Sequence, residues 1–335
     1  MKLMKKNNNL NIKIMTKIKC NRLKNFPISF FAVVLGLMGF TLVMQKIRII
    51  IKLPSYLFVG LLYFTFIIFL IISLIYIIKI IRYPKEVKAE FFHPIKINFF
   101  PLLPKILLIL SVIYLNINMS YSRSFWIVGI ILQFIFSIVI LSIWIRSSNF
   151  KFHHLSPAWF IPIVGNVIVP IAGVAHGFVE ISWFFFSVGI VMWITLFIIV
   201  FNRIIFHNPI PDKLVPTFFI LFAPPAIAFI AYIKLTGELD SFAKILYYIS
   251  LFLFVLIMAQ FRIFSKIKFY LSWWAYSFPM DAITVATILI YHETGWLFFK
   301  ILSFFLLVIL LIIIVYLTYK TSRAIMNKEI CIEEE

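Results

Sequence analysis

The sequence predicts an all-α integral membrane protein with ten transmembrane helices, arranged as five helical hairpins. The chain of 335 residues is 63% hydrophobic and only 13% charged, whereas about a quarter of the residues in a soluble domain are charged. Ten apolar stretches follow one another with short connections, and about 20 apolar residues are enough to cross a bilayer. Prolines fall inside only every second stretch.

The odd-numbered stretches are interrupted by prolines and contain small or polar residues, and they cover 26–44, 98–116, 158–176, 214–235 and 269–291. The even-numbered stretches are apolar on nearly all sides and contain no internal proline, and they cover 55–80, 124–145, 180–202, 242–262 and 296–319. A proline inside a membrane helix removes a backbone hydrogen bond and kinks the helix. The freed carbonyl group must then face protein or a water-filled cavity. We therefore expect five proline-kinked inner helices around a central pore or cavity, surrounded by five outer helices. The alternative is that the small residues serve only to pack helices together. That would explain a single helix of this kind, but it explains less well why the pattern alternates five times.

The distribution of positive charge predicts the orientation. The chain carries 31 Lys and Arg residues. Of these, 23 lie in the tails and the loops on the side of the amino terminus, 7 lie on the opposite side, and Lys105 lies within a stretch. The positive-inside rule therefore predicts a multi-pass protein of the cell membrane with both termini in the cytoplasm. We expect a basic tail over 1–25, a channel domain over 26–320 and a carboxyl-terminal tail over 321–335, with the basic tails contacting anionic lipids rather than nucleic acid.

Sequence signatures of enzymes, metal sites and cofactor sites are absent. The chain contains no Walker A loop, Rossmann glycine pattern or HExxH motif. The two cysteines, Cys20 and Cys331, lie in opposite tails and offer no metal-ligand spacing. The adjacent pair His153-His154 is typical of a solvated loop. We expect no cofactor, no metal and no enzymatic activity.

Two charged side chains lie well inside predicted helices. Lys105 lies about 10 Å into the third stretch, at 1.5 Å per residue, and Asp281 lies near the middle of the ninth. A charge at such depth is costly and usually faces a cavity or a partner. The two could form an ion pair, Lys105 could extend to the cytoplasmic interface, or Lys105 could face the pore and attract anions. An ionised Asp281 on the path would repel anions, so we expect it to be paired, protonated or turned aside.

The ninth stretch contains the run Trp273-Trp274-Ala275-Tyr276-Ser277-Phe278-Pro279-Met280. Supporting motifs occur in a matching order along the chain: Phe26-Pro27 with Gly36, Glu86-Val87-Lys88-Ala89-Glu90, His93-Pro94, Pro157-Ala158-Trp159, Pro162-Ile163-Val164-Gly165-Asn166, Pro216-Thr217 and Ala223-Pro224-Pro225-Ala226. With these motifs the chain resembles the tellurite-resistance/dicarboxylate transporter family, which includes TehA and the plant slow-type (guard-cell) anion channels. The family position that Asp281 occupies is usually small or hydroxyl-bearing, and Lys105 is not part of the family pattern.

The resemblance implies a specific architecture. Members of the family have ten helices in five hairpins around a pore and assemble as trimers, so a homotrimer is expected here. A phenylalanine of the ninth helix closes the pore in the family, and Phe278 matches it. The further pore-lining or pore-shaping candidates are Pro27, Pro104, Lys105, Pro162, Asn166, Pro170, Pro224, Ser277, Pro279 and Asp281.

The function expected from this resemblance is an anion channel. It would conduct nitrate and chloride through a pore gated by Phe278, with positive potential from helix dipoles. The alternative is a proton-coupled transporter of C4-dicarboxylates such as malate, or of a tellurite-type oxyanion, in which Asp281 would carry the proton. A membrane enzyme or sensor would need a catalytic cluster or an output domain, and neither is visible.

Overall fold

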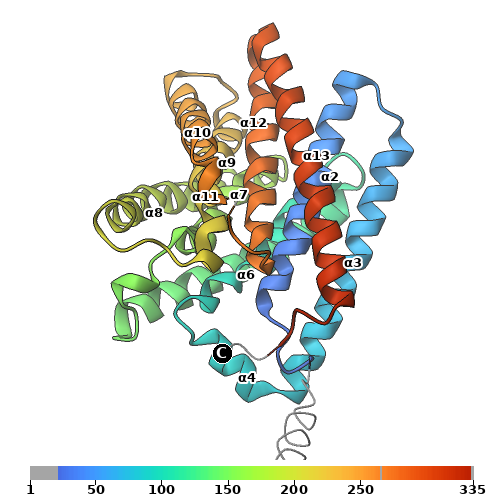
Figure 1. The fold of residues 1–335 in the computed structure, drawn as a ribbon. Helices are drawn as coiled ribbons and strands as arrows, with labels where there is room; N and C mark the ends of the chain where they lie inside the picture. The colour runs from blue at the N-terminus through green and yellow to red at the C-terminus, as the bar shows by residue number, and fades with distance from the viewer. Residues whose placement is uncertain (1–21, 265, 333–335) are drawn as a thin grey trace, which may run out of the picture.

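The structure is a computed structural model that describes residues 22–264 and 266–332. Most of the predicted basic tail, including Cys20, lies outside these residues. The described residues form helices joined by short loops, with no β-strand among them. The first and last described residues lie at the same end of the molecule, near the level of the short helix α4 (Pro84–Phe91) (Figure 1).

Five inner helices alternate along the chain with five outer helices. The inner helices are α2 (Phe31–Ile51), α5 (Leu102–Tyr114), α7 (Ile161–Gly173), α9 (Ala223–Thr236) and α12 (Ser277–Thr294). The outer helices are α3 (Ser55–Arg82), α6 (Met119–Arg146), α8 (Val179–Phe206), α10 (Ser241–Ala259) and α13 (Leu297–Met326). Two short elements, η3 (Phe152–His154) and α11 (Phe261–Phe264), lie in the connections.

The inner helices form a closed ring. In it α2 packs against α5, α5 against α7, α7 against α9, α9 against α12, and α12 against α2. Each outer helix packs against the inner helix that precedes it in the chain. Figure 1 shows two of these pairs side by side, α2 with α3 and α12 with α13.

Burial separates the two sets of helices. In the apolar 18-residue stretches of the spans that contain α2, α5 and α9, 83%, 83% and 89% of the residues are buried. In 18-residue stretches of α3, α6, α8, α10 and α13 the corresponding shares are 28%, 28%, 33%, 39% and 28%. Every residue of α7 is buried. The alternation read from the sequence is therefore an alternation between core and periphery, and the apolar periphery suits contact with lipid.

Eight helical segments of the described chain are long and apolar enough to cross a membrane. These eight include all five outer helices and the segments that contain α2, α5 and α9. The segment Pro157–Gly173 with α7 is apolar but shorter. Helix α12 is not among the eight, because polar residues such as Asp281 and Thr284 lower its mean hydropathy. The structure therefore supports a multi-pass membrane protein, and ten crossings stay a prediction for α7 and α12.

Each inner helix is preceded by a 3₁₀ segment, and none of the outer helices is. These segments are η1 (Ile28–Phe30), η2 (Lys96–Phe99), η4 (Pro157–Phe160), η5 (Asp212–Phe222) and η6 (Leu271–Tyr276). The outer helices instead run as single α-helices of up to 30 residues. A change from 3₁₀ to α geometry therefore marks the entrance of every inner helix.

Most prolines of the inner segments lie at these entrances. Pro162 and Pro224 are the second residues of their α-helices. Pro104 and Pro279 are the third residues of theirs. The first backbone N–H groups of a helix have no partner within it, so a proline there removes no hydrogen bond. Pro170 and Pro216 lie inside helical segments, where the predicted kink remains a prediction.

A buried ion pair connects α4 to the entrance of the first inner helix. The Lys79 ammonium group of α3 lies 2.7 Å from Oε2 of Glu90 on α4, and it also donates to the carbonyl oxygen of Phe26 at 2.8 Å. The other carboxylate oxygen, Oε1, accepts the backbone N–H of Ile28 at 2.7 Å. Tyr76 adds a third donor to Glu90, at 3.2 Å. Three further groups thus satisfy the remaining hydrogen-bonding capacity of a charge pair that would otherwise be costly to bury.

Candidate functional site

The candidate site is a cavity of about 40 Å³ at the centre of the helix ring, here called the central cavity. All five inner helices contribute to its wall. The lining residues are Gly39, Leu42, Lys46, Ile109, Val112, Ile168, Ile227, Ile230, Phe278, Asp281, Ala282 and Val285. A cavity needs about 10–15 Å³ to hold one water molecule, so the central cavity has room for a few waters but not for a hydrated anion.

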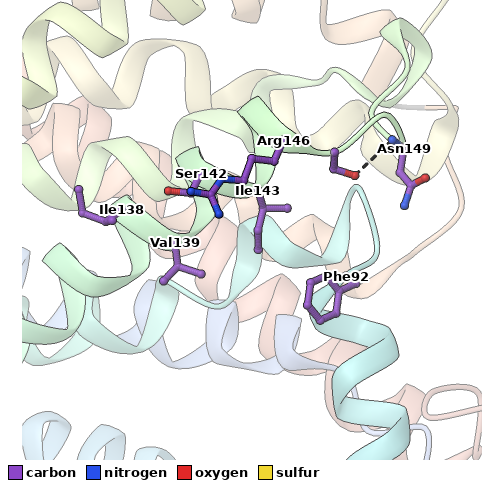
Figure 2. A pocket seen from close by; sticks show the side chains of 8 residues that line it. Phe92, Ile138, Val139, Ser142, Ile143, Arg146 and Asn149 are labelled. Atoms are coloured by element: carbon purple, nitrogen blue, oxygen red, sulfur yellow. Dashed lines mark hydrogen bonds between the residues drawn. The ribbon is translucent and has the colours of Figure 1, made fainter.

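A larger hollow of about 380 Å³ lies on the outside of the molecule. Figure 2 shows its wall, where Phe92 after α4 faces the last turns of α6, including Ile138, Val139 and Arg146. These four side chains are exposed. The hollow is an open groove on an outer helix, away from the ring of inner helices, so its size does not make it the site.

Phe278 is the second residue of α12 and lines the central cavity. The segment before it is held in place by two hydrogen bonds. The Ser277 hydroxyl donates to the carbonyl oxygen of Trp274 at 2.7 Å, and the indole N–H of Trp274 donates to Oγ1 of Thr321 on α13 at 2.8 Å. The half-buried Phe278 therefore lines the cavity from a well-anchored base.

Asp281 lies one turn after Phe278 on the same face of α12, because residues three apart are neighbours on a helix. Its side chain also lines the central cavity. The residue is only 2% exposed, and neither carboxyl oxygen has a hydrogen-bond partner. The ring of inner helices therefore encloses a carboxyl group whose oxygens accept no hydrogen bond.

Two glycines of α2 allow α12 to approach this closely. A Cβ atom at Gly36 would overlap Oγ of Ser277, and a Cβ atom at Gly39 would overlap Oδ2 of Asp281. Small residues at helix interfaces in membrane proteins let the backbones come together in this way. The position of Asp281 thus depends on the absence of a side chain at residue 39.

Lys46 is a lining residue that the sequence analysis did not identify. In the sequence it is one of the seven positive charges predicted for the side opposite the termini, and the structure places it in the wall of the central cavity. A signal was available in the spacing, because Gly39, Leu42 and Lys46 follow one another at intervals of three and four residues. That spacing puts them on one face of a helix.

Lys105 and Asp281 do not form the ion pair that was one of the alternatives. Salt bridges among the described residues join Lys24 to Glu86 and Lys79 to Glu90, and neither Lys105 nor Asp281 takes part in one. Lys105 is the fourth residue of α5 and is 2% exposed. It is therefore enclosed by protein and does not lie among the residues that line the central cavity.

Asn166 faces an outer helix. Its side chain lies 3.2 Å from the hydroxyl group of Ser137 on α6. The neighbouring Gln133 of α6 donates to the carbonyl oxygen of Pro162 at 2.7 Å, and Gly165 packs against the Gln133 amide. The polar side of α7 therefore serves packing against α6, and α7 contributes the apolar Ile168 to the cavity.

The structure brings two of the sequence candidates, Phe278 and Asp281, together in the cavity wall. The other candidates do not line it. Pro27, Pro104, Pro162, Pro224, Ser277 and Pro279 lie at or just before the entrances of the inner helices, and Pro170 lies within α7. They could shape a path without contacting what passes through it. Within the described residues, no group of three or more His, Cys, Asp or Glu residues could hold a metal ion.

Comparison with known proteins identifies the family. The family model described as "Voltage-dependent anion channel" matches residues 25–322. The S-type anion channel SLAH3 of Arabidopsis thaliana is 30% identical over 277 residues, which are 79% of this chain and 43% of the plant protein. The uncharacterized transporter MJ0762 of Methanocaldococcus jannaschii is 29% identical over 300 residues, which are 82% of this chain and 87% of that protein.

A tellurite resistance protein TehA homolog of Haemophilus influenzae is also similar, with 23% identity over 231 residues, covering 67% of this chain and 69% of that protein. The chain thus spans less than half of the plant channel but most of the archaeal transporter. The resemblance inferred from the ninth stretch is confirmed, and it extends through all five inner helices. The chain belongs to the voltage-dependent anion channel family, whose members are anion channels and transporters rather than enzymes.

Proposed function

We propose that this protein conducts small monovalent anions, nitrate and chloride, across the cell membrane through the ring of inner helices. One observation carries the proposal: five helices far apart in sequence enclose one central cavity, and the family-matched Phe278 lines it. The path would run along the axis of the ring. At about 40 Å³ the cavity is too small for a hydrated anion, so conduction requires the Phe278 ring to move aside.

The wall of the cavity suggests how the path would select. Apart from Lys46 and Asp281 its side chains are apolar, so few polar groups can replace the water that an anion loses. Selectivity should then follow the cost of dehydration and favour weakly hydrated anions such as nitrate over chloride. Lys46 adds a positive charge at one end of this wall and would raise the local concentration of anions.

The gate is tested with the purified protein in liposomes or with the protein in oocytes. Phe278→Ala removes the ring and should raise the basal nitrate current. Phe252→Ala is the matched control, because Phe252 on α10 is 61% exposed and faces away from the core. An unchanged current in Phe278→Ala, at verified expression, would show that Phe278 is not the gate.

A proton-coupled carrier of C4-dicarboxylates or oxyanions is the second candidate, and the buried Asp281 favours it. Reversal potentials measured in gradients of nitrate, chloride and malate separate the two functions. A current that reverses at the anion's Nernst potential supports a channel. Saturable malate uptake that requires a pH gradient, and that Asp281→Asn abolishes, supports the carrier.

We also propose that both termini are cytoplasmic, that α7 and α12 cross the membrane and that the protein forms a homotrimer in the cell membrane. The charge count of 23 against 7 supports the orientation. The exposed apolar side chains of the outer helices are suited to contact lipid or another subunit. Cysteine accessibility in intact cells tests the orientation, and native mass measurement in detergent tests the trimer.

A further inference from the structure

The carboxyl group of Asp281 is an acid enclosed by the protein without a bonding partner. It is 2% exposed, its two oxygens accept no hydrogen bond, and it forms no salt bridge. It also lines the central cavity beside Phe278. Ordinary helix packing does not require such a group, because an apolar side chain would fill the same space without an unsatisfied polar atom.

The helices around Asp281 offer few groups that could hold its charge. The walls from α5, α7 and α9 contribute only Ile109, Val112, Ile168, Ile227 and Ile230. On α2 the residue opposite Asp281 is Gly39. Lys46 is seven residues further along α2, which is about 10 Å at 1.5 Å per residue. Lys46 is therefore the other ionisable group in the cavity wall, and it is too distant for an ion pair.

The remaining neighbouring groups are engaged elsewhere or lie outside the cavity wall. The Tyr247 hydroxyl of α10 lies 3.1 Å from the Thr287 hydroxyl, which is six residues further along α12 than Asp281. The buried Tyr276 hydroxyl of η6 has no hydrogen-bond partner, but Tyr276 is not among the residues that line the cavity. Thr321 of α13 accepts the Trp274 indole. Lys105 of α5 is enclosed by protein and does not line the cavity. A proton is thus the simplest partner for the Asp281 carboxyl group.

Resting on the proposed function, we propose that Asp281 is a proton-dependent anion site of the central cavity. In its acid form the O–H group donates a hydrogen bond to a passing anion that can accept one, such as nitrate or a small carboxylate. In its ionised form the carboxylate repels the anion and closes the path. The proton comes from water and stays on Asp281 while anions pass, so proton occupancy decides whether the path conducts.

The position of the group makes it effective. Asp281 and Phe278 lie one turn apart on one face of α12 and line the same cavity. An anion on the axis would therefore meet both side chains. Movement of the ring would open the path sterically, and protonation of the acid would open it electrostatically. Anion flux should consequently rise as the pH falls.

The experiment is nitrate flux into liposomes that contain the purified protein, with equal pH on both sides and a clamped membrane potential. Wild-type flux should increase towards acid pH, by up to about tenfold per unit above the midpoint, as a single titrating site dictates. Asp281→Asn keeps the shape of the side chain and a hydrogen-bond donor. The flux through this variant should therefore be independent of pH, and at alkaline pH it should equal the wild-type flux at acid pH. Asp281→Thr is a second neutral variant, for use if the asparagine variant folds poorly.

Three controls isolate Asp281. His176→Gln removes a titratable group between α7 and α8 and should leave the pH profile unchanged. Lys46→Gln should lower the flux and keep its dependence on pH. Phe278→Ala should raise the flux at every pH and also keep that dependence.

The outcomes separate this inference from the proposed function. A wild-type flux that does not vary with pH, or a pH dependence that survives in the neutral variants, overturns the inference alone. A reversal potential that follows the proton gradient would show protons moving with the anion and would overturn it in favour of a carrier. If neither wild type nor Phe278→Ala shows flux above protein-free liposomes, the proposed function fails and the inference fails with it.

Discussion

Gly39 of α2 and Asp281 of α12 lie so close that the carboxyl group occupies the space where a side chain at residue 39 would begin. A Cβ atom at this position would overlap Oδ2 and lie 2.7 Å from Cγ and 2.9 Å from Cβ of Asp281. Two helices separated by more than 200 residues are thus fitted to each other at one glycine. The same contact directs the carboxyl group towards the central cavity.

Gly39→Ala should therefore destabilise the protein and disturb α12. Overpacking of this kind costs about 1–3 kcal/mol, which thermal unfolding in detergent would measure. The effect should shrink when Asp281→Ala is added, because the shorter side chain vacates the space. Gly60→Ala on α3 is the control: an added Cβ there meets nothing within 4 Å, so stability should hold or rise slightly. Equal losses in both glycine variants would contradict the steric explanation.

Glu90→Gln should be among the more damaging substitutions outside the cavity. It leaves the Lys79 ammonium group buried without its counter-charge, which typically costs about 3–5 kcal/mol. It also weakens the bond to Ile28 at the entrance of the first inner helix. Glu86→Gln in the partly exposed Lys24–Glu86 pair should change stability by less than about 1 kcal/mol. Similar unfolding temperatures for the two variants would show that the Lys79–Glu90 pair contributes little.

Thr321→Val tests the anchor behind Phe278. Valine keeps the shape of threonine but cannot accept the indole N–H of Trp274, which would then be buried without a partner. Such a loss costs about 1–3 kcal/mol. Thr321→Ser retains the hydroxyl acceptor and should keep most of the stability. Thermal unfolding distinguishes the two, and a serine variant as unstable as the valine variant would assign the effect to packing.

His176 predicts a dependence of stability on pH. Burial, and secondarily the charge of Arg123, lowers the pKa of His176 from its usual 6.5. The unfolded chain therefore takes up a proton at a higher pH than the folded protein does. Stability is lost as the pH falls through 6.5 towards the lower folded pKa. Between about pH 7.5 and pH 5.5, the unfolding temperature of His176→Gln should fall less than that of the wild type. An identical fall in both proteins would exclude this contribution.

Lys46 should assist anions electrostatically if the path runs through the central cavity. Lys46→Gln should reduce nitrate flux most strongly at low ionic strength, because salt screens the attraction. Lys52→Gln changes a lysine just beyond the end of the same helix, outside the cavity wall, and should have a smaller effect. Nitrate flux measured at two salt concentrations checks this prediction. Equal effects of the two variants would show that Lys46 does not act on anions in the path.

The alternation of the helices could be predicted from the sequence because it is a property of composition along the chain. An internal proline is costly on a lipid-facing helix, because the freed carbonyl group would have no partner there, so the prolines accumulate in the buried segments. The role of the prolines was harder to predict. A proline within an apolar stretch indicates a break, but only the backbone shows that Pro162, Pro224 and Pro279 lie in the first turn of an α-helix that follows a 3₁₀ segment.

The sequence by itself determined that this is a membrane protein, that it has an inner and an outer set of helices and that it belongs to an anion-transporting family. Hydropathy and motif order suffice for these conclusions because they do not depend on how a helix is rotated about its axis. Only the tertiary structure decided that Lys46 and Asp281 share a cavity, that Asn166 faces α6 and that Lys105 has no ion pair with Asp281. The rotation of a helix about its axis is set by its packing against neighbouring helices, and the contact between Gly39 and Asp281 is one example.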